Sequence, residues 1–193
     1  MSSLKKSINS KFNDLEIAIR QEKGKLPSSQ GVNAYIVVYP PSQEQEYLNR
    51  VKKDYSEEYI IDISKLFVDF IDKYGKEYGG SYGLDFFLET YKNNRSTTDQ
   101  VFIDENSKEK DLFSLILDNL KKAKNKIPIL IRTGILYGTG IKNNNILETK
   151  VVGKMKKPLI IFYPGTIKED MDGKEVIYFL GEKKASDYRG QFI

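Results

Sequence analysis

The stretch from residue 157 to residue 193 places the strongest constraint on the fold. It begins with an unbroken apolar run, Leu159-Ile160-Ile161-Phe162-Tyr163, which halts at Pro164-Gly165-Thr166. A continuous β-branched and aromatic run of this length is typical of a strand that is buried on both faces of a sheet. Asp172-Gly173 then predicts a turn, and residues 176–180 a second strand. We therefore expect the chain to complete its sheet at this end.

Buried strands and amphipathic helices alternate along the rest of the chain. Similar apolar runs predict strands over residues 34–39, 59–63 and 127–131. Apolar residues at three- and four-residue spacing predict helices over 3–22, 43–54, 64–75, 84–91 and 108–124, with another helix entered at 143–145. This order predicts a single α/β domain with a mostly parallel sheet and helices on both faces. A length of 193 residues suits one such domain.

Local signals predict where several helices begin. Ser42 and Ser64 are predicted N-caps, with Gln45 completing a capping box after Ser42, and Ser2 or Ser3 is the predicted cap of the first helix. The Tyr- and Gly-rich stretch 74–83 is interpreted as a connecting loop rather than a base-stacking surface. The helix over 3–22 has a polar face of mixed charge, so packing on its own domain or on a partner is favoured over membrane binding.

The composition restricts the chemistry that is open to the chain. It contains no His and no Cys, which excludes Ser-His-Asp triads, His-carboxylate metal centres, thiolate nucleophiles and zinc–thiolate sites. An enzyme would have to rely on carboxylates, Lys, Tyr or backbone groups. Apolar runs are far shorter than a membrane span. The lack of Cys and of a secretory apolar region predicts a cytoplasmic protein.

The first strand-to-helix junction lacks the residues of a phosphate-binding loop. In nucleotide-binding α/β domains this junction is rich in glycine. Here it reads Tyr39-Pro40-Pro41-Ser42 followed by Gln and Glu residues, without a glycine or a Lys followed by Ser or Thr. We therefore expect no standard ATP site at this position.

A second candidate loop follows the strand over 127–131. Residues 132–140 contain Arg132, Thr133 and three glycines in a GxxxGxG spacing, which fits neither a Walker A loop nor the dinucleotide fingerprint. α/β folds place ligands at the carboxyl ends of their strands, so this loop either faces a ligand or partner or is a structural turn. Arg132 is the best single basic candidate for contact with an anion.

Net charge gives a weak indication of nucleic-acid binding. The chain carries 31 basic and 27 acidic residues, a net charge of +4. Two lysine clusters, 121–126 and 154–157, stand out from this interleaved background. They are interpreted either as solubilising helix ends or as the contacts of a DNA-binding accessory protein.

The C-terminal stretch contains, in order, Phe162-Tyr163-Pro164-Gly165-Thr166, Gly173, Phe179-Leu180-Gly181, Tyr188-Arg189 and Phe192-Ile193. This order resembles the C-terminal pattern of the BrxB family, the small component of bacteriophage-exclusion (BREX) systems, in which a strand ending in PG is followed by LFG and YYRAF. Tyr39-Pro40-Pro41 resembles its YPP, and Thr133-Gly134 with Tyr137 resembles its post-strand segment. The match covers about residues 34–193 with gaps. In that segment the family usually carries a Pro and, later, an Arg-x-His. Here Gly138-Thr139-Gly140 follow Tyr137, Lys142 stands in place of the Arg, and the chain contains no His.

The resemblance implies cytoplasmic phage defence within a complex that includes a PglZ-type phosphatase-like protein, a DNA methyltransferase and a large ATPase. It provides no catalytic residue, so we expect a non-enzymatic assembly subunit, without metal or cofactor, that contacts the PglZ-type protein and reaches DNA only through the complex. The alternative is a nucleotide- or DNA-binding accessory subunit. The N-terminal helix and the C-terminal aromatic end are the expected surfaces. Candidate ligand or partner residues are Tyr39, Pro40, Arg132, Thr133, Gly134, Tyr137, Gly138, Gly140, Pro164, Gly165, Tyr188, Arg189 and Phe192.

Overall fold

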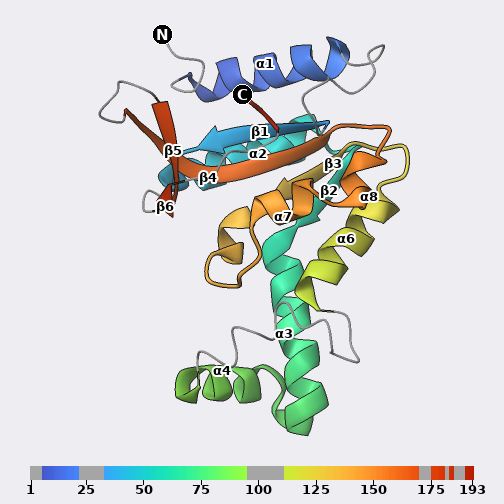
Figure 1. Ribbon diagram of the computed structural model, residues 1–193, viewed down its shortest axis with the longest axis vertical. Helices are drawn as coiled ribbons and strands as arrows, with labels where there is room; N and C mark the ends of the chain where they lie inside the picture. Colours follow the sequence, from blue (N-terminus) through green and yellow to red (C-terminus); the bar gives the residue numbers. More distant parts are fainter. Residues whose placement is uncertain (1–5, 22–32, 95–110, 170–174, 181–182, 185–189) are drawn as a thin grey trace.

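The computed structural model describes residues 6–21, 33–94, 111–169, 175–180, 183–184 and 190–193. Its centre is a sheet in which five strands run in the order β2-β3-β4-β1-β7, all paired in parallel (Figure 1). Two further strands, β5 and β6, add to the far end of β4 in antiparallel pairing. The bounds are β1 (Ala34–Tyr39), β2 (Tyr59–Asp62), β3 (Pro128–Ile131), β4 (Leu159–Glu169), β5 (Glu175–Phe179), β6 (Lys183–Lys184) and β7 (Gln191–Phe192). The predicted α/β fold with a mostly parallel sheet is confirmed.

Helices cover both faces of this sheet, as predicted. One face carries α1 (Ile8–Gln21) and α2 (Glu44–Asp54). The other carries α3 (Ile63–Gly79), α6 (Leu112–Lys122), α7 (Asn143–Leu147) and α8 (Lys150–Gly153). Among the described residues, every helix is too short or too polar to cross a lipid bilayer.

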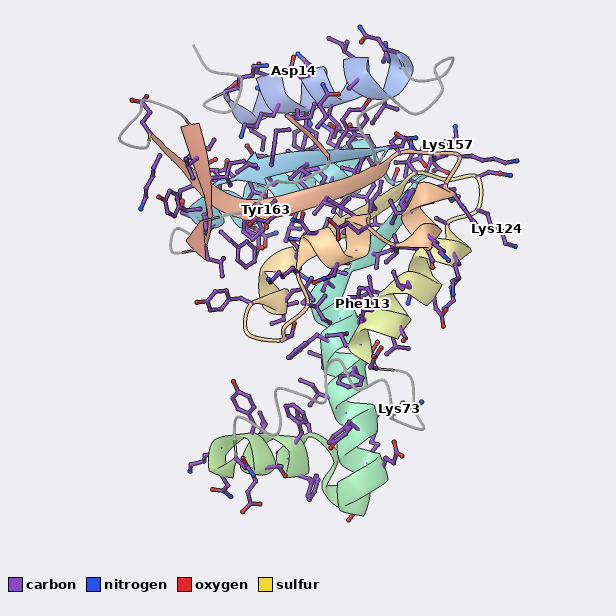
Figure 2. All side chains as sticks on the ribbon, in the orientation of Figure 1. Asp14, Lys73, Phe113, Lys124, Lys157 and Tyr163 are labelled. Atoms are coloured by element: carbon purple, nitrogen blue, oxygen red, sulfur yellow. The ribbon has the colours of Figure 1, made fainter. Side chains whose placement is uncertain are left out.

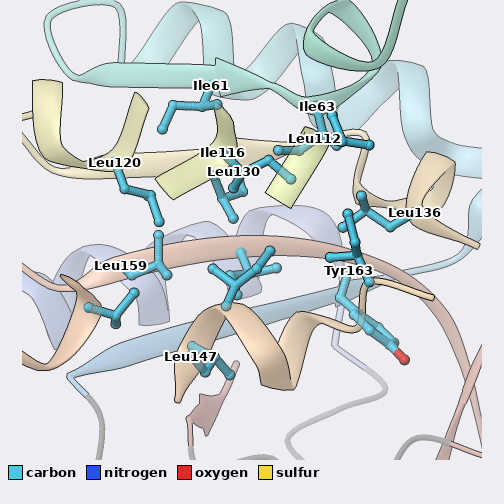
Figure 3. Packing of buried hydrophobic residues seen from close by; sticks show 14 of the residues in the cluster. Ile61, Ile63, Leu112, Ile116, Leu120, Leu130, Leu136, Leu147, Leu159 and Tyr163 are labelled. Carbon is cyan, nitrogen blue, oxygen red and sulfur yellow. The ribbon is translucent and has the colours of Figure 1, made fainter. Parts of the chain in front are cut away.

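Strand β1 shows why the predicted strands carry continuous rather than alternating apolar runs. Tyr35 and Val37 belong to the core on the α1–α2 side, where Phe12 and Leu15 of α1 pack against the sheet. Ile36 and Val38 belong to the core on the opposite side. Since successive side chains of a strand point to opposite faces, a strand covered twice needs apolar residues at every position. Figure 3 shows the second core, in which residues of β2, β3 and β4 meet α6 and α7.

Two predicted helix caps are wrong. Asp62, not Ser64, is the N-cap of α3, because its carboxylate accepts hydrogen bonds from the backbone N–H groups of Ser64 and Lys65. Ser42 lies in the short 3-10 helix η3 (Pro41–Gln43), and α2 begins after Gln43 without a side-chain cap. The proline pair favours one turn of 3-10 helix ahead of α2. As a result, the N-cap position of α2 falls on Gln43 and not on Ser42.

The predicted loop at 74–83 is mostly helical. Helix α3 continues through Gly75 to Gly79, and η4 (Gly80–Tyr82) leads directly into α4 (Gly83–Asn93). A Cβ on Gly79 would collide with the side chain of Phe86, so glycine permits α3 and α4 to approach closely here. The two helices form a hairpin, and Figure 1 shows it standing away from the sheet.

Strand β4 also differs from its prediction, since it does not stop at Pro164-Gly165. Pro164 is the last residue in register with β1, opposite Tyr39, and Gly165 is the first residue paired with β5, opposite Phe179. The Pro-Gly pair therefore marks a change of partner within one strand of eleven residues. The predicted strand after it is confirmed as β5. The predicted turn at 172–173 and the predicted caps Ser2 and Ser3 lie outside the described residues.

Candidate functional site

At the carboxyl edge of the parallel strands, the anion candidate Arg132 already has an anionic partner. Its Nη1 donates a hydrogen bond of 2.7 Å to Oδ2 of Asp62. Arg132 ends β3 in the left-handed backbone region, at φ 57°, a conformation that turns the chain sharply into the following loop. The guanidinium therefore joins the ends of β2 and β3.

Tyr39, from the end of β1, is likewise bound within the fold. Its side chain is buried, stacks on Tyr47 at 5.0 Å between ring centroids, and donates a hydrogen bond of 2.8 Å to Oε1 of Glu44. Burial, then the hydrogen bond to Glu44, raises the pKa of Tyr39 above its ordinary value. A neutral phenol of this kind donates a proton to a hydrogen bond rather than acting as a base. Pro40 follows as the residue ahead of η3.

The loop after β3 is built from internal contacts. Thr133 is fully buried, and its Oγ1 donates to the carbonyl of Phe162 at 2.8 Å. Gly134 lies against Pro164, whose Cγ would be 3.2 Å from an added Cβ. Gly138 and Gly140 have positive φ values of 86° and 77°. These glycines turn the chain, which agrees with the structural alternative for this loop.

Tyr137 is the exception in that loop, because its side chain is half exposed. Its ring lies 6.0 Å from the ring of Phe179 in β5, and Phe179 lies 4.9 Å from Tyr163 of β4. The three rings form an aromatic cluster at the point where β4 changes partner, in which Tyr163 is buried and Tyr137 is exposed. This is the part of the carboxyl edge that a partner protein would be able to contact.

The remaining predicted candidates are spread over the sheet. Pro164 and Gly165 lie inside β4, and the Pro164 carbonyl accepts a hydrogen bond of 3.0 Å from Leu180 N–H. Phe192 lies in β7, opposite Ile36 of β1. Tyr188 and Arg189 lie outside the described residues. The structure thus brings together Tyr39, Arg132, Gly134 and Pro164 at one edge, while Phe192 belongs to an outer strand.

Metal chemistry finds no support in the described part of the chain. No group of three or more His, Cys, Asp or Glu side chains gathers there in a way that would hold a metal ion. The close carboxylate at the edge, Asp62, is committed to the α3 N-terminus and to Arg132.

A concave surface lies at the opposite, amino-terminal edge of the sheet. A pocket of about 530 Å³ opens between the end of α6 and α8. Seven of its lining residues are lysines: Lys121, Lys124, Lys126, Lys150, Lys154, Lys156 and Lys157. Its other described lining residues are apolar or neutral: Leu120, Ala123, Asn125, Pro128, Val151 and Met155. The sequence offered the two lysine clusters separately, and the pocket that unites them was not predicted.

A second surface that the sequence did not indicate is the α3–α4 hairpin. Tyr74 of α3 contacts Phe87 of α4 at 6.0 Å between ring centroids, and Phe70 and Tyr91 extend this aromatic cluster along their own helices at 6.2 Å. Outside this aromatic cluster, Val68, Leu84 and Leu88 are exposed. Leu88 exposes 53% of its surface.

Helix α1 holds an unexpected buried cation. Lys11 is only 2% exposed, and its ammonium donates a hydrogen bond to the carbonyl of Val38. Burial, with a smaller effect from Lys6, lowers the pKa of Lys11 to about 8. The amphipathic pattern had placed this residue on the polar face of the helix.

Comparison with protein-family models, with curated proteins and with solved structures gives no match for this chain.

Proposed function

We propose that the chain is a non-catalytic assembly subunit of a BREX-type phage-defence complex, and that it docks on the PglZ-type component through the α3–α4 hairpin. The family and the partner come from the resemblance of the sequence to BrxB proteins. The observation that carries the docking role is the exposure of two apolar side chains, Leu84 and Leu88, on α4 of a hairpin that stands away from the sheet (Figure 1). Val68 is also exposed, on α3.

The hairpin has the features of a preorganised docking element. Leu84 and Leu88 are four residues apart on α4 and therefore lie on the same face of the helix. The contact between Tyr74 and Phe87 and the close approach of Gly79 to Phe86 hold α4 against α3 before a partner binds, which lowers the entropic cost of association. Exposed apolar side chains of this kind are typical of protein–protein contacts.

The carboxyl edge of the sheet supports the non-catalytic part of the proposal. The polar side chains that a ligand would contact there are already hydrogen-bonded within the fold: Arg132 to Asp62, Thr133 to the Phe162 carbonyl and Tyr39 to Glu44. The glycine-rich loop supplies turns rather than a cradle for phosphate.

The test is co-purification of the tagged chain with the PglZ-type protein, with and without ATP, followed by mass photometry. We expect a stable complex that does not require nucleotide, and we expect Leu84→Ser with Leu88→Ser to weaken it at least tenfold. Ile17→Ser on α1 is the matched control, because Ile17 is 52% exposed, close to the value for Leu88. Retention of full affinity by the double variant, or equal losses in variant and control, would remove the hairpin from the interface. The absence of any complex at micromolar concentration would refute the assembly role.

A further inference from the structure

We propose that the lysine-lined pocket at the amino-terminal edge of the sheet binds single-stranded nucleic acid, with one nucleotide inside the pocket and the neighbouring phosphates on the surrounding lysines. This site lies away from the α3–α4 hairpin and is independent of the docking role proposed above. In Figure 2, Lys124 and Lys157 lie on one side of the molecule, far from Lys73 on the hairpin.

The topology of the sheet creates the pocket. Lys126 lies two residues before β3, and Lys157 lies two residues before β4. Strands β3 and β4 are parallel neighbours, with Ile129 opposite Ile160, so the segments that enter them start side by side. Two lysine clusters that are about thirty residues apart in sequence thus meet at one edge of the sheet.

The charge of the pocket is concentrated well beyond that of the whole chain. The chain as a whole is nearly balanced, with 31 basic and 27 acidic residues, whereas the described lining residues include seven lysines and no carboxylate. Lys121 pairs with Asp118 at 2.9 Å. None of the other six pocket lysines forms an ion pair with a described residue. Ammonium groups gathered in this way repel one another. A polyanion relieves that repulsion by neutralising them, and its phosphates release their own condensed cations.

Helix capping does not account for most of these lysines. Cations are favoured in the last turn of a helix, where they complement the dipole. That explanation fits Lys121 in α6, which ends at Lys122. Lys124, Lys126, Lys156 and Lys157 lie in the segments that follow α6 and α8, beyond the helix ends.

The pocket floor narrows the class of ligand. Leu120, Ala123, Pro128, Val151 and Met155 give it an apolar base beneath the lysines. A ligand that fills it needs an apolar flat group together with several negative charges, which a nucleotide unit combines. A volume of about 530 Å³ is in the range of small-ligand pockets. A planar anionic membrane would reach the lysines at the rim of this recess rather than its apolar base, so it fits the lining less well than a nucleotide unit does.

A single strand fits this arrangement better than a duplex or a free nucleotide. In a duplex the bases are paired inside the helix, so only phosphates would reach the lysines and the apolar floor would stay empty. A free nucleotide carries its charge at one end and would leave several lysines unneutralised. A strand places one sugar and base in the recess and successive phosphates on the rim.

The experiment is a fluorescence-anisotropy titration of a labelled 15-nucleotide oligothymidylate with the full chain at several salt concentrations. The pocket variant is Lys154→Gln, Lys156→Gln and Lys157→Gln, and the control is Lys65→Gln, Lys73→Gln and Lys92→Gln on the hairpin. Each set removes three charges, so both lower the net charge from +4 to +1. We expect the pocket variant to lose at least tenfold in affinity and about two units of salt slope, at about 0.7 per phosphate contact. The control should change less than threefold.

A second variant from the other cluster, Lys124→Gln with Lys126→Gln, should also weaken binding, and thermal unfolding checks that every variant is folded. Equal losses in pocket and control variants would overturn the site. The site would also be overturned if a 15-base-pair duplex competed as well as the unlabelled oligonucleotide at equal phosphate concentration, because that result indicates binding to the backbone alone. Equal competition by ATP would overturn it too, because that result indicates binding of a free nucleotide. Binding to phosphatidylserine vesicles without binding to the oligonucleotide would also overturn it.

Discussion

Nη1 of Arg132 lies 2.7 Å from Oδ2 of Asp62, and the other carboxylate oxygen of Asp62 caps helix α3. Oδ1 accepts hydrogen bonds from Ser64 N–H at 3.1 Å and from Ser64 Oγ at 2.7 Å. One carboxylate therefore joins the end of β3 to the start of the helix that carries the hairpin. The arginine that the sequence offered as an anion contact serves this junction.

Asp62→Ala should lower the free energy of unfolding by about 1–3 kcal/mol, the sum of a lost helix cap and a partly exposed ion pair. Asp62→Asn keeps an oxygen that is able to cap α3 and should lose less. The control is Asp69→Ala, an exposed position on α3. Urea denaturation measures all three variants. A loss below 0.5 kcal/mol for Asp62→Ala, or a loss as large for the control, would contradict the junction role.

The buried Lys11 predicts a pH dependence of stability. Its pKa falls from an ordinary 10.5 to about 8 in the fold, so between these values the unfolded chain holds more protons than the folded one. Stability should therefore rise with pH through that window, by at most about 1.4 kcal/mol per pH unit. Lys11→Met should abolish the rise, while Lys53→Met at an exposed site should retain it. Urea denaturation between pH 7 and pH 10 measures the slopes, and a rise that survives Lys11→Met would show that another group causes it.

Three buried tyrosines predict the reverse trend at higher pH. Burial raises the pKa of Tyr47 to about 12, with a further contribution from Glu46, and it raises the pKa of Tyr39 and Tyr55 as well. Above the ordinary value of 10 the unfolded chain ionises first, so stability falls as pH rises. Tyr47→Phe should reduce this fall. Ultraviolet titration of tyrosinate in the folded and urea-unfolded chain measures it, and equal titration curves would refute the prediction.

A substitution at Gly165 tests the point in β4 where its pairing changes from β1 to β5. A Cβ at this position would lie 3.1 Å from the Tyr178 carbonyl and 3.2 Å from the Tyr163 ring, in a place where backbone cannot easily move. Gly165→Ala should cost about 1–3 kcal/mol of unfolding free energy, as overpacking does. Gly153→Ala is the matched control, because nothing lies within 4 Å of its added Cβ, and it should be neutral or slightly stabilising. Thermal denaturation compares the two. Equal effects would show that the crowding at Gly165 is relieved without cost.

The predictable parts of this molecule are those that local patterns determine. Apolar runs such as Leu159–Tyr163 identify the strands because both faces of the sheet are covered, and period-3.6 patterns identify α2 and α6. Pro164-Gly165 was interpreted as a strand end because that dipeptide breaks most strands. The pairing of Gly165 with β5 is what continues β4 past this dipeptide. Asp62 and Arg132 are 70 residues apart, so no local signal joins them.

The same reasoning explains why the candidate site was only partly predicted. Both lysine clusters were visible in the sequence, but the pocket between them exists because β3 and β4 are parallel neighbours. The helical hairpin was hidden by glycines at 75, 79 and 80, which indicate a loop in the sequence. In the fold, the close approach of α3 and α4 requires the glycine at 79, and Gly80 turns the chain at a positive φ of 63°. Tertiary pairing, rather than local propensity, decides each of these features.

Ile193 tests whether the C-terminal strand completes the core as its apolar character predicted. Its side chain is 5% exposed among residues of α1 and the sheet, and its N–H donates a hydrogen bond of 3.0 Å to the Ile36 carbonyl. Ile193→Ala should lower the free energy of unfolding by about 2–4 kcal/mol through a cavity beneath α1. Gln191→Ala, at an exposed position in β7 two residues before Ile193, should change the free energy of unfolding by less than about 0.5 kcal/mol. Urea denaturation followed by tyrosine fluorescence separates the two, and a cost for Ile193→Ala no larger than that for Gln191→Ala would show that β7 adds little to the core.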